Sequence, residues 1–318
     1  MKKIVSLLIT ILALSISSCS NSNTSGSESV EPSSKHEHTI TSISVKRDAY
    51  KRTYIKGNDF DENGLIVRGT CSSCNEIINV DYSLENNTEL DLEQTSITIK
   101  YKDLSLDYRI KVVEKYHIAC VGDSLTAGHM WANESYPTKL SAMVDKDYEV
   151  GNFGVNGISI TGYGGSWDDP DMRYIKQDVY TNSVNFNPDI FAIMLGTNDA
   201  TGWADAEATF DEYYHILLDS YIEQFPFAKF IMMVSPPVVT PNQFGIPNDT
   251  IRDEINPRQR DLADEYGFEV LDLREEFEAI DNYQSKFLRP NNDNVHFTSE
   301  GAEYVAGRVW EIAKDLTF

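Results

Sequence analysis

Two kinds of hydrophobic pattern divide the chain after its first forty residues. Across residues 40–114, apolar positions alternate with polar ones, which predicts short β-strands with one buried face. The clearest case is a hairpin whose two strands cover residues 97–101 and 106–112, separated by a polar turn. From Tyr116 onward, short apolar runs alternate with helical patterns instead. That alternation predicts an α/β domain with a parallel sheet over residues 115–318.

Five short segments are the candidate strands of this sheet. They cover residues 117–121, 148–153, 190–195, 230–234 and 268–271. Helical periodicity is clearest over residues 206–224, where one side carries Phe210, Tyr213, Leu217 and Tyr221. We expect a second helix from Pro257 to Gly267, because proline favours the first turn and glycine the end. The last helix is expected over residues 302–316, with Thr298 or Ser299 as its cap.

The first twenty residues have the pattern of an export signal. Lys2 and Lys3 precede an apolar run over residues 4–16, which is shorter than the roughly 20 residues that span a bilayer. The following Ile-Ser-Ser-Cys, ending at Cys19, resembles the lipobox of bacterial lipoproteins. The resemblance implies a signal peptide over residues 1–18 and an exported protein anchored to the cell envelope through a lipidated Cys19. An ordinary signal peptide that contains a cysteine is the alternative.

Residues 19–39 are rich in Ser, Asn and Glu without apolar periodicity, which predicts a disordered tether. Residues 54–67 then resemble the bacterial Ig-like domains of surface proteins. That resemblance implies a small all-β sandwich over residues 40–114, of a kind that is usually a spacer. Within it, Cys71 and Cys74 lack the second cysteine pair of a zinc site. A disulfide that closes a turn is therefore favoured, and two free thiols are the alternative.

Polar and glycine-rich segments follow the predicted strands of the α/β part. Gly-Asp-Ser-Leu covers residues 122–125 after the first strand, and Gly-Val-Asn-Gly covers residues 154–157 after the second. Gly-Thr-Asn-Asp covers residues 196–199 after the third, and Asp-Asn-Val-His covers residues 293–296 before the last helix. Ligands of open α/β sheets bind outside the carboxyl ends of the strands. All four segments are therefore expected at one functional edge.

These four blocks, in this order, resemble those of the SGNH (GDSL-type) hydrolases. The resemblance runs from about Tyr116 to the C-terminus and implies a flavodoxin-like three-layer α/β sandwich with a five-stranded parallel sheet. It implies a nucleophile at Ser124, a base at His296 and an orienting carboxylate at Asp293. The implied oxyanion donors are Ser124, Gly157 and Asn198. Asn294 departs from the family, in which glycine is commoner, and is expected to alter the turn but not the chemistry.

The chemistry of these residue types agrees with the resemblance. A serine hydroxyl is a poor nucleophile until a neighbouring imidazole takes its proton, and a neutral histidine can do so near pH 7. A carboxylate three residues before His296 can reach the other ring nitrogen and fix the tautomer. Backbone and amide N–H groups can then stabilise the oxyanion that forms on attack at an ester carbonyl. This chemistry requires no metal and no organic cofactor.

Each of these residues also has a structural role open to it. Ser124 can cap the following helix, Gly157 can serve a turn and Asn198 can tie a loop. Asp123 and Asp199 are interpreted as loop and cap residues and not as catalysts.

The other histidines and one cysteine are interpreted from their positions in the sequence. His129, five residues after Ser124, is a rival base without a carboxylate at matching spacing. His117 and His215 are interpreted as structural, and Cys120, within an apolar run, as a core thiol. His36 and His38 are interpreted as solvated residues of the tether.

Composition narrows the classes of partner. The chain has 318 residues with a formal net charge of −23, from 27 Lys and Arg against 50 Asp and Glu. Such a surface repels phosphate backbones, so nucleic acid is not expected as a partner. Hydrophobic residues make up 41% of the chain, which is enough to build a core and excludes a wholly disordered protein.

The substrate is inferred from the loops. Aromatic residues near the motifs are candidate sugar contacts, namely Trp131, Tyr163, Trp167 and Trp203. The sequence contains no long apolar loop or lid of the kind that would indicate a fatty-acyl tunnel. The chain is also expected outside the cell. The leading interpretation is therefore an esterase that removes O-acetyl groups from extracellular poly- or oligosaccharide. A lipase, lysophospholipase or thioesterase of the same fold is one alternative, and a non-catalytic glycan-binding surface lipoprotein is another.

Overall fold

The structure is a computed structural model that describes residues 39–74, 76–291 and 293–316. The predicted signal peptide, Cys19 and the predicted tether up to His38 lie outside the described residues. Among the helices that are described, none is both long enough and apolar enough to cross a membrane.

The first described part of the chain, up to Val113, consists of β-strands. They are β1 (Ile40–Arg47), β2 (Thr53–Ile55), β3 (Ile66–Cys71), β4 (Ile77–Asn79), β5 (Ser83–Glu85), β6 (Ser96–Tyr101), β7 (Leu104–Arg109) and β8 (Lys111–Val113). They form antiparallel sheets of order β1-β3-β4 and β5-β6-β7 and a parallel pair, β2 with β8. Tyr54, Leu90, Ile97 and Ile99 are fully buried in a hydrophobic cluster of this part. The predicted alternation of buried and exposed positions is thus confirmed, while the Ig-like assignment stays a prediction.

The predicted hairpin and the predicted Cys71–Cys74 disulfide are compared with this part of the structure in turn: the first differs in one strand, and the second stays open. The predicted hairpin is present as β6 and β7, but its second strand ends at Arg109 instead of continuing to Val112. Val112 belongs to β8, which pairs in parallel with β2, so the chain changes its pairing partner after Arg109. The Sγ atoms of Cys71 and Cys74 lie 2.6 Å apart after β3. The disulfide between them stays a prediction.

The second part contains the predicted five-stranded parallel sheet. Its strands are β9 (Tyr116–Gly122), β10 (Tyr148–Gly154), β13 (Ile190–Met194), β14 (Lys229–Val234) and β15 (Glu269–Asp272), and their order is β10-β9-β13-β14-β15. Every neighbouring pair is parallel. This is the flavodoxin-like order. Since β9 lies between β10 and β13, the loops that follow these three strands are neighbours at one edge.

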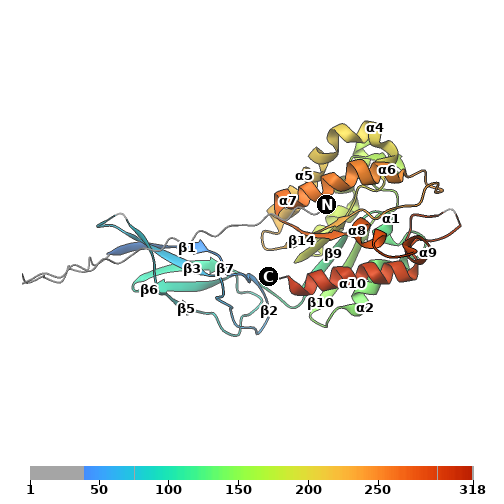
Figure 1. Ribbon diagram of the computed structural model, residues 1–318. Helices are drawn as coiled ribbons and strands as arrows, with labels where there is room; N and C mark the ends of the chain where they lie inside the picture. The colour runs from blue at the N-terminus through green and yellow to red at the C-terminus, as the bar shows by residue number, and fades with distance from the viewer. Residues whose placement is uncertain (1–38, 75, 292, 317–318) are drawn as a thin grey trace, which may run out of the picture. The chain divides into compact units, whose positions relative to one another are not determined.

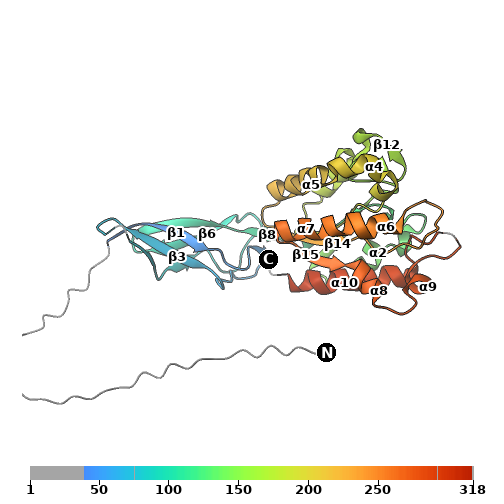
Figure 2. The same cartoon turned by 45° about the horizontal axis from the view of Figure 1, so that its top comes forward.

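Helices cover both faces of this sheet, with α2 and α10 on one side and α5 and α7 on the other (Figures 1 and 2). The helices are α1 (Ser124–Ala127), α2 (Tyr136–Met143), α3 (Asp178–Asn185), α4 (Trp203–Ala206), α5 (Phe210–Gln224), α6 (Asn248–Thr250), α7 (Asn256–Tyr266), α8 (Leu273–Glu278), α9 (Tyr283–Phe287) and α10 (Ser299–Asp315). A two-stranded ribbon, β11 (Tyr163–Gly164) with β12 (Trp167–Asp168), follows β10.

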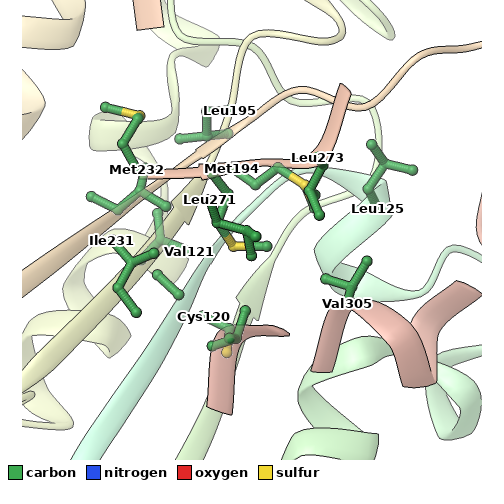
Figure 3. Close-up of a cluster of buried hydrophobic side chains, with 14 of the residues drawn as sticks. Cys120, Val121, Leu125, Met194, Leu195, Ile231, Met232, Leu271, Leu273 and Val305 are labelled. Atoms are coloured by element: carbon green, nitrogen blue, oxygen red, sulfur yellow. The ribbon is translucent and has the colours of Figure 1, made fainter. Parts of the chain in front are cut away.

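The covered faces explain why the central strands β9, β13 and β14 are largely apolar. A parallel sheet between two helical layers buries both faces, so its central strands need apolar residues at successive positions. All five residues of β13 are buried. Figure 3 shows Cys120, Met194 and Met232, from three neighbouring strands, in one cluster with Leu125 and Val305. Cys120 is the core thiol that the sequence predicts, and its burial raises its pKa to about 12.

Helix boundaries were predicted less well. α7 starts at Asn256, one residue before the predicted Pro257, and a π-helical turn over Ile251–Ile255 joins it to α6. Proline does lie in the first turn of α7, where its missing N–H is tolerated, but the chain is already helical before it. The predicted stop is confirmed, because Gly267 ends α7 in the left-handed conformation with φ 67°. Thr298 caps α10, which starts earlier than predicted.

Candidate active site

The structure brings Ser124, His296 and Asp293 into one hydrogen-bonded chain. The Nε2 atom of His296 lies 2.9 Å from Oγ of Ser124, although the two residues are 172 positions apart. Its Nδ1 atom lies 3.0 and 3.1 Å from the two carboxylate oxygens of Asp293. All three residues are buried. This is the geometry in which an imidazole can take the serine proton while a carboxylate orients the ring.

The position of Ser124 follows from the turn that leaves β9. Asp123 is the N-cap of α1, and its Oδ1 accepts a hydrogen bond of 2.8 Å from the backbone N–H of Leu125. The capping role that the sequence left open for Ser124 therefore belongs to Asp123, which leaves the serine hydroxyl for His296. Gly122 makes this sharp turn possible, since a Cβ there would meet Oγ1 of Thr126 at 2.0 Å.

Asp293 is held by the backbone of its own turn. Its Oδ1 accepts hydrogen bonds from the N–H groups of Val295 and His296, at 3.1 and 2.8 Å. Burial raises the pKa of Asp293, but the hydrogen bonds and the charge of His296 outweigh burial and hold that pKa below its usual value. The carboxylate is therefore ionised at neutral pH, as an orienting group for an imidazolium must be.

The loops after β10 and β13 carry the two other predicted oxyanion donors. Gly157 has φ 74°, and a Cβ there would lie 2.0 Å from Oγ of Ser166. A glycine is thus required both by the backbone conformation and by close packing. The Nδ2 atom of Asn198 donates to the carbonyl oxygen of Ile158 at 2.8 Å. An amide nitrogen carries two hydrogens, so Asn198 retains one for a ligand.

Asp199 ties these two loops together. One carboxylate oxygen accepts from the N–H of Ile160 at 3.0 Å. The other accepts from the N–H and the hydroxyl of Thr161, at 3.0 and 2.8 Å. Burial raises the pKa of Asp199 to about 6, against these hydrogen bonds, which lower it. Asp199 thus has a structural role, as the sequence predicts: it begins the 3-10 turn Asp199–Gly202 and ties this turn to residues 160–161 of the other loop.

A cavity of about 250 Å³ opens onto these residues. It is lined by Ser124, His129, Asn156, Gly157, Gly165, Ser166, Asn198, Phe244, Ile246 and His296. The implied nucleophile, base and both loop donors therefore face one space. A volume of this size suits a short acyl group and part of its alcohol.

The ring of His296 is flanked by two other rings. His129 stacks on it with centroids 4.2 Å apart and an interplanar angle of 7°. Phe244 meets it edge-on, with centroids 4.9 Å apart and an angle of 87°. Burial and the neighbouring His296 lower the pKa of His129. The rival base is therefore a packing partner of His296, and Oγ of Ser124 is hydrogen-bonded to the ring of His296.

The four predicted sugar contacts are not brought to one place. Trp131 lies beside Ser124, in a crevice of about 10 Å³, with the guanidinium of Arg289 3.6 Å above its ring. Tyr163 and Trp167 belong to the β11–β12 ribbon and do not line the 250 Å³ cavity, although Trp167 is 41% exposed.

Trp203, the fourth candidate, does not line the 250 Å³ cavity, and its role as a sugar contact stays a prediction. Its ring packs edge-on against Phe210, with centroids 5.4 Å apart, and the guanidinium of Arg258 lies 5.3 Å above it. Trp203 therefore fills a gap between helices and is not part of the cavity wall. Its place directly after the Asn198 motif in sequence did not indicate where the ring points.

The aromatic wall at Phe244 was missed from the sequence. Phe244 and Ile246 lie in the loop over residues 235–247, which follows β14. The signal was present, because this loop also leaves the carboxyl end of a parallel strand. It contains several prolines and no titratable side chain, so it resembles an ordinary connection.

Removing the amide of Asn198 tests its predicted role. We expect Asn198→Ala to lower kcat for p-nitrophenyl acetate by about 10²–10³-fold with little change in KM, since the donor acts mainly on the transition state. Asn198→Asp keeps the size but loses the donor, and the same loss is expected. Steady-state kinetics of both variants check this. A large rise in KM at unchanged kcat would contradict it.

The buried carboxyl of Asp123 predicts a pH-dependent stability. Burial, with a contribution from the charge of Asp199, raises the pKa of Asp123 to about 7 in the folded state. The pKa of an aspartate in the unfolded chain is about 3.9. As pH rises from about 4 to about 7, this group therefore lowers the free energy of unfolding by up to about 4 kcal/mol. In Asp123→Asn that loss is absent. The melting temperature of the variant should therefore fall less between pH 5 and pH 8 than that of the wild type, and parallel curves would refute the assignment.

The fold and the site define a class of protein. A serine–histidine–aspartate chain at the carboxyl edge of this five-stranded parallel sheet is the arrangement of an SGNH hydrolase fold. The chain belongs to the GDSL-like Lipase/Acylhydrolase family, whose model matches residues 120–304.

Individual relatives agree with this family. The chain is 25% identical over 209 residues to an acetylxylan esterase of Xylanibacter ruminicola, a match that covers 59% of this chain and 41% of the relative. It is 24% identical over 178 residues to the GDSL esterase/lipase CPRD49 of Arabidopsis thaliana, covering 50% of this chain and 66% of the relative. The chain thus spans less than two thirds of the length of either curated relative.

Solved structures support the fold. An aryl esterase of M. smegmatis matches with a TM-score of 0.50 at 17% identity, over 63% of this chain and 99% of its own. A protein described as a GDSL-like lipase of Parabacteroides merdae matches with the same TM-score and identity, over 64% of this chain and 96% of its own.

Proposed function

We propose that the protein is a serine ester hydrolase that removes O-acetyl groups from extracellular carbohydrate. The observation that carries the proposal is the hydrogen-bonded chain from Oγ of Ser124 through His296 to Asp293, at the wall of a cavity. Membership in the GDSL-like family supports the reaction type.

The reaction follows from this geometry in two halves. Oγ of Ser124 attacks the ester carbonyl carbon and its proton moves to Nε2 of His296. The oxyanion accepts hydrogen bonds from the N–H groups of Ser124 and Gly157 and from the amide of Asn198. The bond to the alcohol oxygen then breaks, and His296 returns the proton to that oxygen. This leaves an acyl group on Ser124.

Water completes the cycle. It attacks the acyl carbon while His296 takes one of its protons, and the second tetrahedral intermediate breaks its bond to Oγ of Ser124. The proton returns to Ser124, and the carboxylic acid leaves. Asp293 stays ionised throughout and stabilises the imidazolium. Every step uses side chains and backbone groups of this chain together with one water molecule.

The small acyl group is supported by the cavity. A space of about 250 Å³, walled in part by Asn156, Gly157, Ser166 and Asn198, favours acetate over a long apolar chain. The acetylxylan esterase among the relatives supports the carbohydrate part.

The proposal is tested with a panel of esters. We expect hydrolysis of acetylated xylo-oligosaccharides and p-nitrophenyl acetate, with activity falling steeply from acetyl to octanoyl p-nitrophenyl esters. A fluorophosphonate probe should label Ser124, which peptide mass spectrometry can locate. Preference for long-chain esters or lysophospholipids would overturn the carbohydrate assignment. Absence of both turnover and labelling would instead favour a non-catalytic glycan-binding role.

The cellular location belongs to the same proposal. We propose that Cys19 carries lipid and tethers the chain to the envelope, on the lipobox resemblance of residues 16–19. Cys19→Ala should then shift the expressed protein from the membrane fraction to the soluble fraction and abolish its labelling by an alkyne fatty acid. A variant that stays in the membrane fraction would contradict the anchor.

A further inference from the structure

The residues that line the cavity at Ser124 include a polar group and an apolar group. The polar group comprises small or polar residues of the oxyanion loops, namely Asn156, Gly157, Ser166 and Asn198. The apolar group comprises His129, Phe244 and Ile246, and the rings of His129 and Phe244 contact each other with centroids 5.7 Å apart. The cavity therefore offers a ligand both polar groups and an apolar wall.

The proton transfers of the reaction determine which part of the cavity holds the alcohol group of the ester. His296 must return its proton to the alcohol oxygen, so this oxygen lies within about 3 Å of Nε2 when the ester bond breaks. The ring of Phe244 lies edge-on to His296 with centroids only 4.9 Å apart. The other hollow beside Ser124, at Trp131, has only about 10 Å³, which is roughly the space of one water molecule. The alcohol therefore leaves along the Phe244 wall.

The loop that carries Phe244 is internally braced. The side-chain oxygen of Asn242 accepts from the N–H groups of Phe244 and Ile246, at 3.2 and 3.0 Å. Its Nδ2 atom donates to the carbonyl oxygens of Val239 and Ile246, at 3.1 and 2.8 Å. Asn242 thus links both ends of the loop by hydrogen bonds and holds the ring of Phe244 in a fixed position.

Asn294 ties this braced loop to the catalytic turn. It lies between Asp293 and His296, and its Nδ2 atom donates to the carbonyl oxygen of Pro241 at 3.0 Å. Its own carbonyl oxygen accepts from the N–H of Val239 at 2.9 Å. Asn294 has φ 57°, a left-handed conformation that glycine adopts at less cost. Glycine there would keep the backbone bond to Val239 and lose the side-chain bond to Pro241.

We infer that Asn294 is a positioning residue that holds the Phe244 wall beside His296 and so favours esters of ring-shaped alcohols, such as sugars, over esters of small alcohols. The inference rests on the proposed ester hydrolysis. The physical reason is that the flat apolar ring of Phe244, held in a fixed position, packs against one face of a sugar ring. If the loop over residues 235–247 loses its contact with Asn294, the ring of Phe244 is no longer held in that position.

The test compares two acetate esters on one preparation of enzyme. The ratio of kcat/KM for an acetylated xylo-oligosaccharide to kcat/KM for methyl acetate does not depend on the fraction of folded protein. We expect Asn294→Gly, and Asn294→Asp, which replaces the donor by an acceptor, to lower this ratio about fivefold, as for the loss of one hydrogen bond of about 1 kcal/mol. Most of the change should lie in KM for the sugar ester.

A matched control and a double variant separate this role from a general one. Asn282 is exposed, has φ 61° and makes no side-chain capping hydrogen bond to α9, so Asn282→Gly should leave the ratio unchanged. Phe244→Leu should lower the ratio, and adding Asn294→Gly to it should cause little further loss, because both changes remove the same wall.

The outcomes distinguish the inference from the function beneath it. An unchanged ratio in Asn294→Gly, or losses that add fully in the double variant, would overturn the inference while leaving ester hydrolysis intact. A wild-type protein that hydrolyses neither ester would overturn the proposed function, and this inference with it.

Discussion

Ser124→Ala is expected to lower kcat for p-nitrophenyl acetate by about 10⁴–10⁶-fold, the range found when a catalytic serine is removed. The hydroxyl oxygen of Ser124 lies 2.9 Å from Nε2 of His296 and faces the cavity. Alanine offers no atom that can form the acyl intermediate. The helix cap does not depend on this hydroxyl, because Asp123 supplies it. The fold should therefore survive the change, and the loss should appear in kcat and in fluorophosphonate labelling together.

A second serine serves as the control for this variant. Ser141 is exposed on α2, where alanine is a favourable residue. Ser141→Ala should keep wild-type activity and labelling, and thermal unfolding should give similar melting temperatures for both variants. Activity of Ser124→Ala near the wild-type level would mean that another group is the nucleophile, and the proposed mechanism would fail.

The parts of the molecule that follow local rules were predicted from the sequence. The five parallel strands were predicted to within one residue at each end. The central strands were clearest, because β13 is buried at every position and β9 at all but His117. The segments after these strands then had to meet at one edge. His296 lies far from Ser124 in sequence; its segment was expected at the same edge of the sheet, and the family resemblance assigned it the role of base.

The parts that depend on tertiary packing were not predicted. The direction in which the Trp203 ring points is set by Phe210 and Arg258, which no local pattern encodes. The wall at Phe244 depends on Asn242, which braces its own loop, and on Asn294, which contacts that loop from the turn of Asp293 and His296. The same limit applies to the strand that stops at Arg109, because the partner of Val112 is β2, far away in sequence. Residues in such loop contacts do not follow the hydrophobic periodicity of helices or strands, so sequence patterns cannot identify them.

Asp293→Asn is expected to lower kcat for p-nitrophenyl acetate by about 10⁴-fold while leaving the fold intact. Asparagine keeps an oxygen that can accept from the N–H groups of Val295 and His296, as Oδ1 of Asp293 does at 3.1 and 2.8 Å. Its amide, however, donates toward Nδ1 of His296, which favours the tautomer with the proton on Nε2. That nitrogen then cannot take the proton of Ser124. The variant also removes the negative charge that stabilises the imidazolium.

The same substitution at Asp169 is the matched control for Asp293→Asn. Asp169 is exposed, and its carboxylate likewise accepts from a backbone N–H, that of Asp171 at 2.9 Å. Asp169→Asn should retain wild-type kcat, which shows that loss of one carboxylate from a turn is harmless by itself. Asp293 also has a lowered folded pKa, so the stability it contributes is present at neutral pH and is lost as pH falls through that pKa. Asp293→Asn should therefore lose less stability than the wild type below about pH 4. A variant with wild-type kcat would show that the carboxylate beside His296 serves the turn alone.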